Sequence, residues 1–321
     1  MKFFTLIPHG TRFDFMRLRW VSLGIAFALM LAAIGAIAFK GFNFALDFTG
    51  GNVTELRFER PVDVDDVRQR LDAAGYPGAQ VQTFGSGNDL LVRMQLDGEA
   101  GGADNVAANA RAAQEITRAV STPDNPGKVM RSDFVGPQVG KELALNGIWA
   151  VIFVVVGFLA YISFRFEKKF AIAAVIASLQ DVTIVLGWFS LTGHEFDLTV
   201  LAGVLSVLGF SINDTIVVFD RIRENFRSMR ADPTTIINAS INQTLSRTVI
   251  TSFVAFLTVL ALYLYGGGSL RGMAESMMIG VIVGTLSSIF VAAPLLTLGF
   301  LKVTKQDLMP KAKDEALARR P

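Results

Sequence analysis

The residues best suited to chemistry in this sequence are ionisable side chains inside apolar segments. Asp181 and Asp214 each interrupt a long stretch that has no other charge, and Glu275 lies near the start of a third such stretch. An ionisable group at bilayer depth costs at least ~2.5–3.5 kcal/mol, so it usually faces protein or a wet cavity. A carboxyl that moves between apolar surroundings and a nearby cation can take up and release a proton. Asp214 is therefore the first candidate proton carrier and Asp181 the second, whereas Glu275 is predicted to be an interfacial charge.

The candidate cation for Asp214 is Arg247, where the fifth apolar segment begins. Gln243, Arg247 and Thr251 recur every four residues and predict a polar stripe that runs into the membrane. Two simpler interpretations remain open. Asp214 could serve only as an interhelical hydrogen-bonding group, and Arg247 could extend to the lipid headgroups.

Two further patterns concern helix packing. Asn213, beside Asp214, falls on one helical face with Gly209 and Ser206. Gly280 and Gly284 form a GxxxG motif. Small and polar residues on one face allow helices to pack closely and to hydrogen-bond, so both patterns predict contacts inside the bundle or with a partner.

Other kinds of chemistry are not indicated. The sequence has no cysteine, which excludes disulfides, thiolate metal sites and a cysteine nucleophile. Its two histidines, His9 and His194, are far apart, so a histidine metal site is not expected. No nucleophile–base pair or phosphate-binding loop is evident, and the basic residues form no nucleic-acid patch. We predict a protein that is not an enzyme and binds no nucleic acid or cofactor, with protons as its coupling ion.

Six segments have the composition of transmembrane helices. Charged residues make up 18% of the chain, against roughly 25% in soluble domains, and they are nearly absent from these segments. Each is long enough to cross a ~30 Å hydrocarbon core, where only a helix satisfies the backbone. The expected spans are residues 20–39, 143–164, 170–193, 198–219, 248–270 and 272–301. The start of the fifth helix remains open between Pro233 and Gln243. A signal peptide is the alternative for the first span, which is longer than the usual ~7–15 apolar residues.

Orientation follows from the positive charges of the short loops. Basic residues gather before the first span, between the second and third, between the fourth and fifth, and after the sixth. The short loops on the other side carry a single lysine or arginine, Arg271. The positive-inside rule then predicts a multi-pass protein with both termini in the cytoplasm, residues 1–19 as an N-terminal segment and 302–321 as a tail.

Residues 40–142 are predicted to form an extracytoplasmic domain. Alternation and turn residues predict strands at 52–60, 79–84, 90–96 and 129–135, helices at 64–73 and 105–120, and loops at 85–88, 98–104 and 123–128. The order βαββαβ is that of a ferredoxin-like α+β fold. The fold class is therefore an α-helical integral membrane protein with six transmembrane helices and one ferredoxin-like domain, which we expect to be a docking module.

Three long strings of residues resemble a known family. They are LDFTGG at 46–51, LSVLGFSINDTIVVFDRIREN at 205–225 and INQTLSRTVITS at 241–252. They are similar to SecF subunits of the SecD/SecF family, part of the bacterial Sec protein-export machinery and related to RND proton-driven transporters. The likeness covers nearly the whole chain, with six spans and a large domain after the first.

The resemblance implies a function and a set of partners. Members pair with SecD as a heterodimer in the bacterial inner membrane and use the proton motive force to assist the SecYEG channel. Unfolded preprotein, membrane lipid, YajC and YidC are further implied partners. Asp214 and Arg247 match the aspartate and arginine of the family's proton pathway, while Asp181 has weaker support and Asn213 adjoins Asp214. The motif after the first span comprises Asp47, Phe48, Thr49, Gly50 and Gly51.

Two other functions remain open. The chain could be a self-sufficient RND-type exporter of small molecules, although such exporters usually carry two six-span halves. It could also be a non-conducting structural scaffold whose buried acids only hold helices together. Replacing Asp214 with Asn separates the scaffold from the proton-driven functions, because a scaffold would tolerate the change.

Overall fold

The structure, a computed structural model, describes residues 13–76, 79–84, 88–94, 104–135, 137–304 and 307. The chain divides into two compact units. The helical unit comprises Met1–Asn43 and Ala150–Pro321, and the α/β unit comprises Phe44–Trp149. Each unit has its own cluster of buried hydrophobic side chains.

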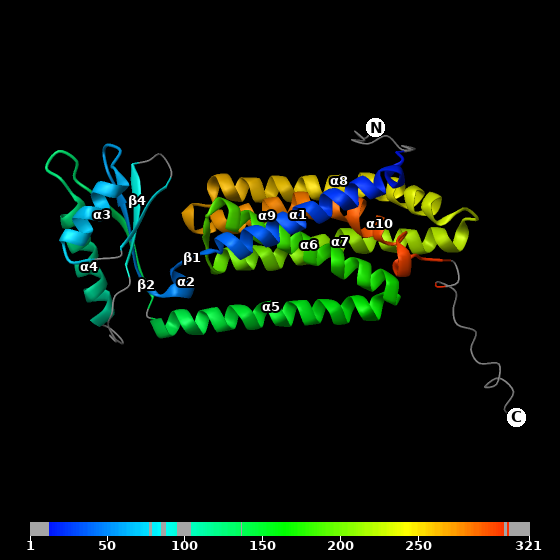
Figure 1. The fold of residues 1–321 in the computed structure, drawn as a ribbon, viewed down its shortest axis with the longest axis horizontal. Coiled ribbons are helices and arrows are strands. Elements are labelled where there is room, and N and C mark those ends of the chain that lie inside the picture. Colours follow the sequence, from blue (N-terminus) through cyan, green and yellow to red (C-terminus); the bar gives the residue numbers. More distant parts are fainter. Residues whose placement is uncertain are drawn as a thin grey trace, which may run out of the picture. The chain divides into compact units, whose positions relative to one another are not determined.

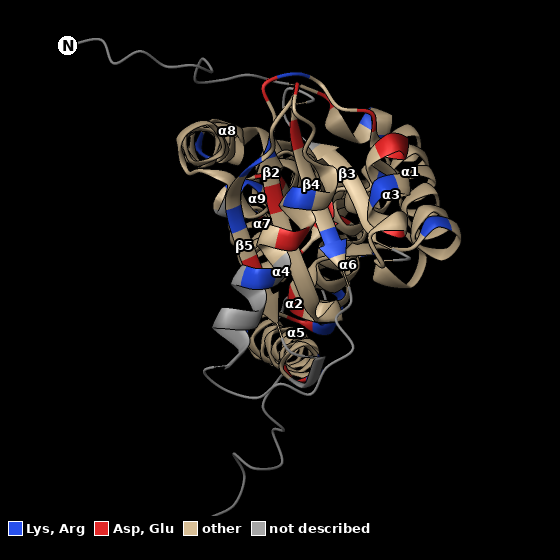
Figure 2. Ribbon diagram, turned by 90° about the vertical axis from the view of Figure 1, so that its left-hand side faces the viewer, with Lys and Arg blue, Asp and Glu red and all other residues tan. Residues whose placement is uncertain are grey.

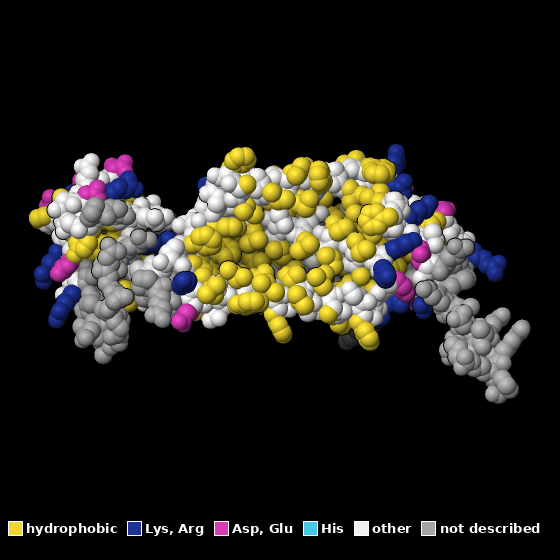
Figure 3. Space-filling model, turned by 60° about the horizontal axis from the view of Figure 1, so that its bottom comes forward, with side chains coloured by type: hydrophobic (Ala, Val, Ile, Leu, Met, Phe, Trp, Pro, Cys, Tyr) yellow, Lys and Arg dark blue, Asp and Glu magenta, His cyan; other side chains and the backbone are white. Residues whose placement is uncertain are grey.

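The part of the chain that the structure describes contains six helices long and apolar enough to cross a membrane, as predicted. They are α1 (Arg19–Lys40), α5 (Pro137–Arg165), α6 (Lys168–Thr192), α7 (Leu198–Ser228), α8 (Pro233–Tyr265) and α9 (Gly268–Ser287). Figure 1 shows α1, α6, α7, α8 and α9 side by side. On the face drawn in Figure 3, hydrophobic side chains cover most of the helical unit, as expected for a surface in lipid.

The fourth and fifth helices extend beyond the expected apolar spans. α7 continues past residue 219 to Ser228, and α8 begins at Pro233, the earlier of the two starts left open. Asp232 is the N-cap of α8, and hydroxyl bonds from Thr234 and Thr235 lower the pKa of its carboxyl below the usual value. α8 ends at Tyr265 rather than 270, because glycines follow and Gly267 has a φ of +79°.

The sixth span differs from the continuous helix expected over 272–301. After α9 the chain forms a π-turn (Ser288–Ala292), the short helix α10 (Ala293–Leu295) and a 3₁₀ turn (Gly299–Leu301). Pro294 has no N–H to donate to the carbonyl of Phe290, four residues earlier. The Ser22 hydroxyl of α1 donates to that carbonyl instead, at 2.9 Å. The interruption is therefore stabilised by a neighbouring helix.

Small residues set the distance between α7 and α9. A Cβ added at Gly280 would overlap the Val207 side chain, and one at Gly284 would lie 3.1 Å from the Cβ of Ser211. A Cβ at Gly203 would overlap the Ser276 hydroxyl. The GxxxG motif thus lies against α7 inside the bundle, and the four-residue spacing on both helices is typical of close ridge-into-groove packing.

This packing predicts that Gly280→Val destabilises the helical unit by about 1–3 kcal/mol, because the added methyl groups would have to displace α7. Gly157→Val is the matched control, since a Cβ there meets nothing within 4 Å. Unfolding of the purified protein in detergent, followed by circular dichroism, measures both. Equal stability of the two variants would contradict the packing.

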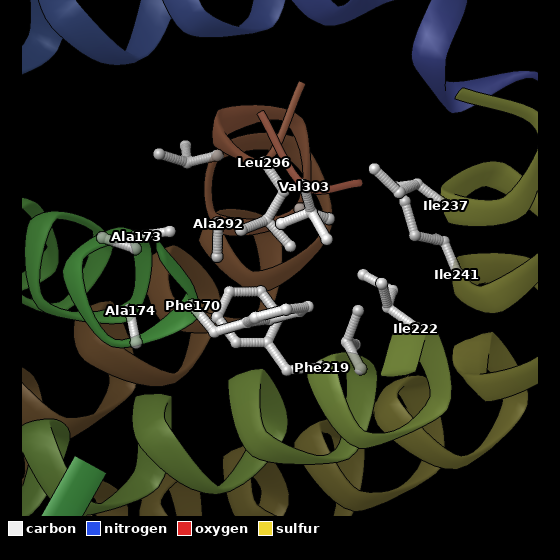
Figure 4. Close-up of a cluster of buried hydrophobic side chains, with 14 of the residues drawn as sticks. Phe170, Ala173, Ala174, Phe219, Ile222, Ile237, Ile241, Ala292, Leu296 and Val303 are labelled. Atoms are coloured by element: carbon white, nitrogen blue, oxygen red, sulfur yellow. The ribbon is translucent and has the colours of Figure 1, made fainter. Parts of the chain in front are cut away.

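A cluster of buried hydrophobic side chains joins α6, α7 and α8 to the chain that follows α9, where Ala292, Leu296 and Val303 belong to it (Figure 4). The rings of Phe170 and Phe219 meet edge to face, with centroids 5.2 Å apart. Ile222 and Ile237 are fully buried beside them. These contacts explain why α7 and α8 remain packed beyond the apolar spans.

The α/β unit has the predicted ferredoxin-like topology. Its elements are β2 (Gly51–Arg57), α3 (Val64–Ala73), β3 (Gln80–Phe84), β4 (Asp89–Met94), α4 (Asp104–Val120) and β5 (Lys128–Val135). The sheet order is β3-β4-β2-β5, and every strand pair is antiparallel. Leu56, Val92 and Ile116 lie in the core between the sheet and the helices. The first expected strand ends at Arg57 rather than residue 60, and residues 85–87, 95–96 and 98–103 of the expected elements lie outside the described residues.

The other face of this sheet carries paired charges beside the apolar side chains of Val53 and Leu91. Arg57 of β2 forms a salt bridge with Asp89 of β4, with Nε and Oδ1 2.7 Å apart. Arg131 and Asp133 pair on β5. Figure 2 shows basic and acidic positions on β2 and β4. The remaining described elements are short: a 3₁₀ turn (Phe15–Leu18), β1 (Asn43–Phe44), α2 (Leu46–Thr49) and β6 (Glu195–Phe196).

Candidate functional site

Asp214 lies between three helices of the helical unit. It is on α7, and only 2% of its surface is exposed. The Ser252 hydroxyl of α8 donates to its Oδ2 at 3.2 Å, and the Thr285 hydroxyl of α9 donates to Ser252 Oγ at 2.7 Å. A buried carboxyl with a neutral hydroxyl donor has no direct charge partner, so its ionised form depends on charges farther away.

Arg247 supplies such a charge. It lies on α8, five residues before Ser252, and is within electrostatic range of Asp214. Among the ion pairs of the described residues, none joins Arg247 to Asp214. The arginine is exposed, together with Gln243 and Thr251 of the predicted stripe. The stripe therefore runs along the outer face of α8, with the cation near the carboxyl but not bound to it.

Asn213 is also exposed, on the outer face of α7 with Ser206 and Gly209. The structure therefore places Asn213 away from the hydrogen bonds of Asp214. Polar groups on the outside of a membrane helix are costly in lipid, so they favour contact with another polar surface.

Asp181 is a second buried carboxyl, on α6, which also packs against α7. It is fully buried and accepts a hydrogen bond from the Ser211 hydroxyl of α7 at 2.5 Å. Ser211 is three residues before Asp214, so the α7 residue that binds Asp181 lies about one turn from Asp214. The structure joins Asp181 to α7 and Asp214 to α8, and it shows no direct contact between the two carboxyls.

The residues that the sequence analysis did not connect with Asp214 are hydroxyls. Ser240, Thr244, Thr248 and Ser252 line one buried face of α8 at four-residue spacing. That spacing is visible in the sequence, but the exposed stripe of Gln243, Arg247 and Thr251 has the same period. The sequence alone therefore does not tell which of the two faces is buried. Thr285 could not be identified, because a single threonine in an apolar segment carries no pattern and its role depends on the pairing of α8 with α9.

Glu275 is held by two partners at one end of the helices. Trp188 Nε1 of α6 donates to Glu275 Oε1 at 2.7 Å, and His194 Nδ1 lies 2.9 Å from the same oxygen. The carboxylate thus links α9 to α6 and to the loop that follows it. Glu275 is therefore engaged within the protein, more than an interfacial charge alone requires.

The motif after the first span is a turn with two glycines of positive φ. Asp47, Phe48 and Thr49 belong to α2, and the chain enters β2 through Gly50 (φ +67°) and Gly51 (φ +116°). A Cβ on Gly140 of α5 would lie only 3.0 Å from the Gly50 nitrogen. Two glycines are required for the conformation, and a third allows the start of α5 to approach the turn.

Within the described residues, no group of three or more histidine, aspartate or glutamate side chains is arranged to hold a metal ion. Among the described residues of the helical unit, the buried carboxyl groups are those of Asp181 and Asp214, and each accepts a hydrogen bond from a hydroxyl. This arrangement can bind and release protons without any bound group.

Comparisons with known proteins identify the family of the chain. Residues 115–301 match the family model "Protein export membrane protein SecD/SecF, C-terminal", and 35–62 match "SecD/SecF GG Motif". The chain is 44% identical to protein translocase subunit SecF of Escherichia coli O157:H7 over 293 residues, which are 90% of this chain and 88% of the relative. It is 42% identical to SecF of Pseudomonas aeruginosa, and this match covers 98% of this chain and 99% of the relative.

A solved structure is also similar. The crystal structure of SecDF, described as a translocon-associated membrane protein from Thermus thermophilus, has a TM-score of 0.78 and 36% sequence identity. The match covers 90% of this chain but 38% of that longer chain. With a family model matched over more than half of its length and SecF relatives matched end to end, this multi-pass membrane chain belongs to the SecD/SecF family of protein-export membrane proteins.

Proposed function

We propose that this chain is the SecF-like subunit of a complex with SecD that uses the proton motive force to assist preprotein export through SecYEG. The SecF names of its relatives and its similarity to part of a SecDF chain support the pairing and the pathway. The observation that carries the proton role is Asp214, a carboxyl buried between α7, α8 and α9 within electrostatic range of Arg247.

Proton binding changes the forces between these helices. An ionised Asp214 attracts Arg247 and accepts the Ser252 hydroxyl, whereas a protonated Asp214 is neutral and can donate a hydrogen bond. The two states therefore favour different packing of α8 on α7, and a proton gradient can alternate between them. Asp181 offers a second proton site on α6, and protons are the coupling ion, with no other cofactor.

The outer faces of α7 and α8 are the proposed contact with SecD. Asn213 and Arg247 are exposed on segments that cross the membrane. Polar groups at that depth are stabilised when another helix bundle covers them and supplies polar partners. The α/β unit is proposed to contact unfolded preprotein. The other proposed partners are the SecYEG channel, YajC, YidC and the surrounding lipid.

Both termini are proposed to lie in the cytoplasm of a bacterial inner-membrane protein. A reporter fused after Arg320 is then expected to be active in the cytoplasm, and one inserted between Gly101 and Gly102 outside it. Both insertion points lie outside the described residues. Activity of both reporters on one side of the membrane would contradict the orientation.

Translocation of a preprotein into sealed vesicles tests the proposed function. Vesicles that contain the channel with and without the SecD complex of this chain are compared, each with and without an imposed proton gradient. We expect the gradient to accelerate translocation more strongly when the complex is present. The same acceleration without the complex would contradict the proposal.

A further inference from the structure

Two hydroxyls connect Asp214 to α9. Ser252 Oγ lies 3.2 Å from Asp214 Oδ2, and Thr285 Oγ1 lies 2.7 Å from Ser252 Oγ. Thr285 Oγ1 also lies 2.6 Å from the carbonyl oxygen of Val281, one turn earlier on α9. The connection runs from α7 through α8 to the backbone of α9.

Each hydroxyl carries one proton, so it donates one hydrogen bond at a time. With Asp214 ionised, Ser252 must donate to the carboxylate, because the carboxylate can only accept. Ser252 can then accept from Thr285, which leaves the Val281 carbonyl without the hydroxyl bond. In this state both hydroxyls point toward Asp214.

The opposite arrangement is equally complete when Asp214 is protonated. The carboxyl donates to Ser252 Oγ, Ser252 donates to Thr285 Oγ1, and Thr285 donates to the Val281 carbonyl. Compared with the ionised state, one proton has been added at Asp214. Ser252 and Thr285 keep their own protons, and their hydroxyls have only rotated. All donors have partners in each state, which is the requirement for a buried polar chain that changes direction.

We propose that Ser252 and Thr285 are positioning residues that transmit the charge state of Asp214 to α9 by reversing these hydrogen bonds. The inference rests on the proposed proton role of Asp214. Among the charged groups of the described residues, Arg247 is within electrostatic range of Asp214.

α9 is suited to respond to such a signal. Thr285 lies three residues before the π-turn, and interruptions of this kind are frequent at functional sites. The freed carbonyl of Phe290 in that turn is held by Ser22 of α1. The same helix packs closely on α7 through Gly280 and Gly284. A change in the hydroxyl bond at Val281 can therefore reach both α7 and α1.

The test compares Thr285→Val, which keeps the shape but removes the hydroxyl, with Thr285→Ser, which keeps the hydroxyl. Thr258→Val is the matched control, because its hydroxyl also bonds a carbonyl four residues earlier but on an exposed face of α8. The purified complex with SecD is titrated with acid, and infrared difference spectra record the carboxyl band that Asp214→Asn removes.

We expect Thr285→Val to shift that band and to lower gradient-driven translocation by about threefold, the factor for an average membrane hydrogen bond. Thr285→Ser should restore both, and Thr258→Val should change neither. A band in Thr285→Val that matches wild type would overturn the inference. If Thr285→Val fails to assemble, Ser252→Ala must shift the band and Ser252→Thr must restore it, and a band unchanged by Ser252→Ala overturns the inference too. The band reports the hydroxyl chain even if export proves independent of Asp214, so the two proposals can fail separately.

Discussion

Asp214→Asn is expected to give a folded, assembled complex that no longer responds to a proton gradient. Asparagine is nearly isosteric and can still accept the Ser252 hydroxyl, but it cannot ionise. Hydrogen bonds in membrane proteins average ~0.6 kcal/mol, so the loss of stability should be small. Gradient-driven acceleration of translocation should fall to the level seen without a gradient, whereas translocation that does not depend on the gradient should continue.

Asp220→Asn is the matched control. Asp220 lies on the same helix but is partly exposed and pairs with Arg165 at 2.7 Å. The charge change is identical, yet we expect the gradient response to remain. If Asp214→Asn prevented assembly with SecD, the carboxyl would be a structural group, and the scaffold interpretation would gain support.

Arg247→Met is expected to produce the second large loss of gradient response. Arg247 is the cation found near Asp214 among the described residues, so its removal leaves the ionised carboxylate without a stabilising charge. The proton would then be released less readily, and each cycle would stall in the protonated state. Vesicle translocation at matched levels of complex measures the effect.

Arg247→Lys separates charge from geometry. Because Arg247 makes no direct salt bridge with Asp214 among the described ion pairs, a point charge at the same place should retain part of the response. A Met variant as active as wild type would show that Arg247 only extends to the lipid headgroups. Equal losses in Lys and Met variants would indicate that the guanidinium shape matters, through a contact with the partner.

Much of the fold could be predicted, because apolar length and strand alternation are local properties. The helix ends were less predictable. Ile222 and Phe226 continue the buried face of α7 beyond residue 219, where the expected span ends, so hydropathy marks only the part expected in lipid. The break before Pro294 depends on the Ser22 hydroxyl of another helix, which no local pattern reveals.

The candidate site was predictable where a charge stood out from its surroundings. Asp181 and Asp214 are conspicuous in apolar segments, and both are buried in the structure, Asp181 against α7 and Asp214 against α8. The hydroxyls that bond them are not conspicuous, since serine and threonine are common in membrane helices. Thr285 acquires its meaning only when α8 and α9 are packed together.

The most direct test of the account uses a preprotein stalled part-way through the channel in sealed vesicles from which ATP has been removed. A proton gradient imposed across the membrane is then the only energy source. We predict that the wild-type complex completes translocation of the stalled chain and that the Asp214→Asn complex, assembled to the same level, does not. Completion to the same extent in both complexes would contradict the proposal that proton binding at Asp214 drives export.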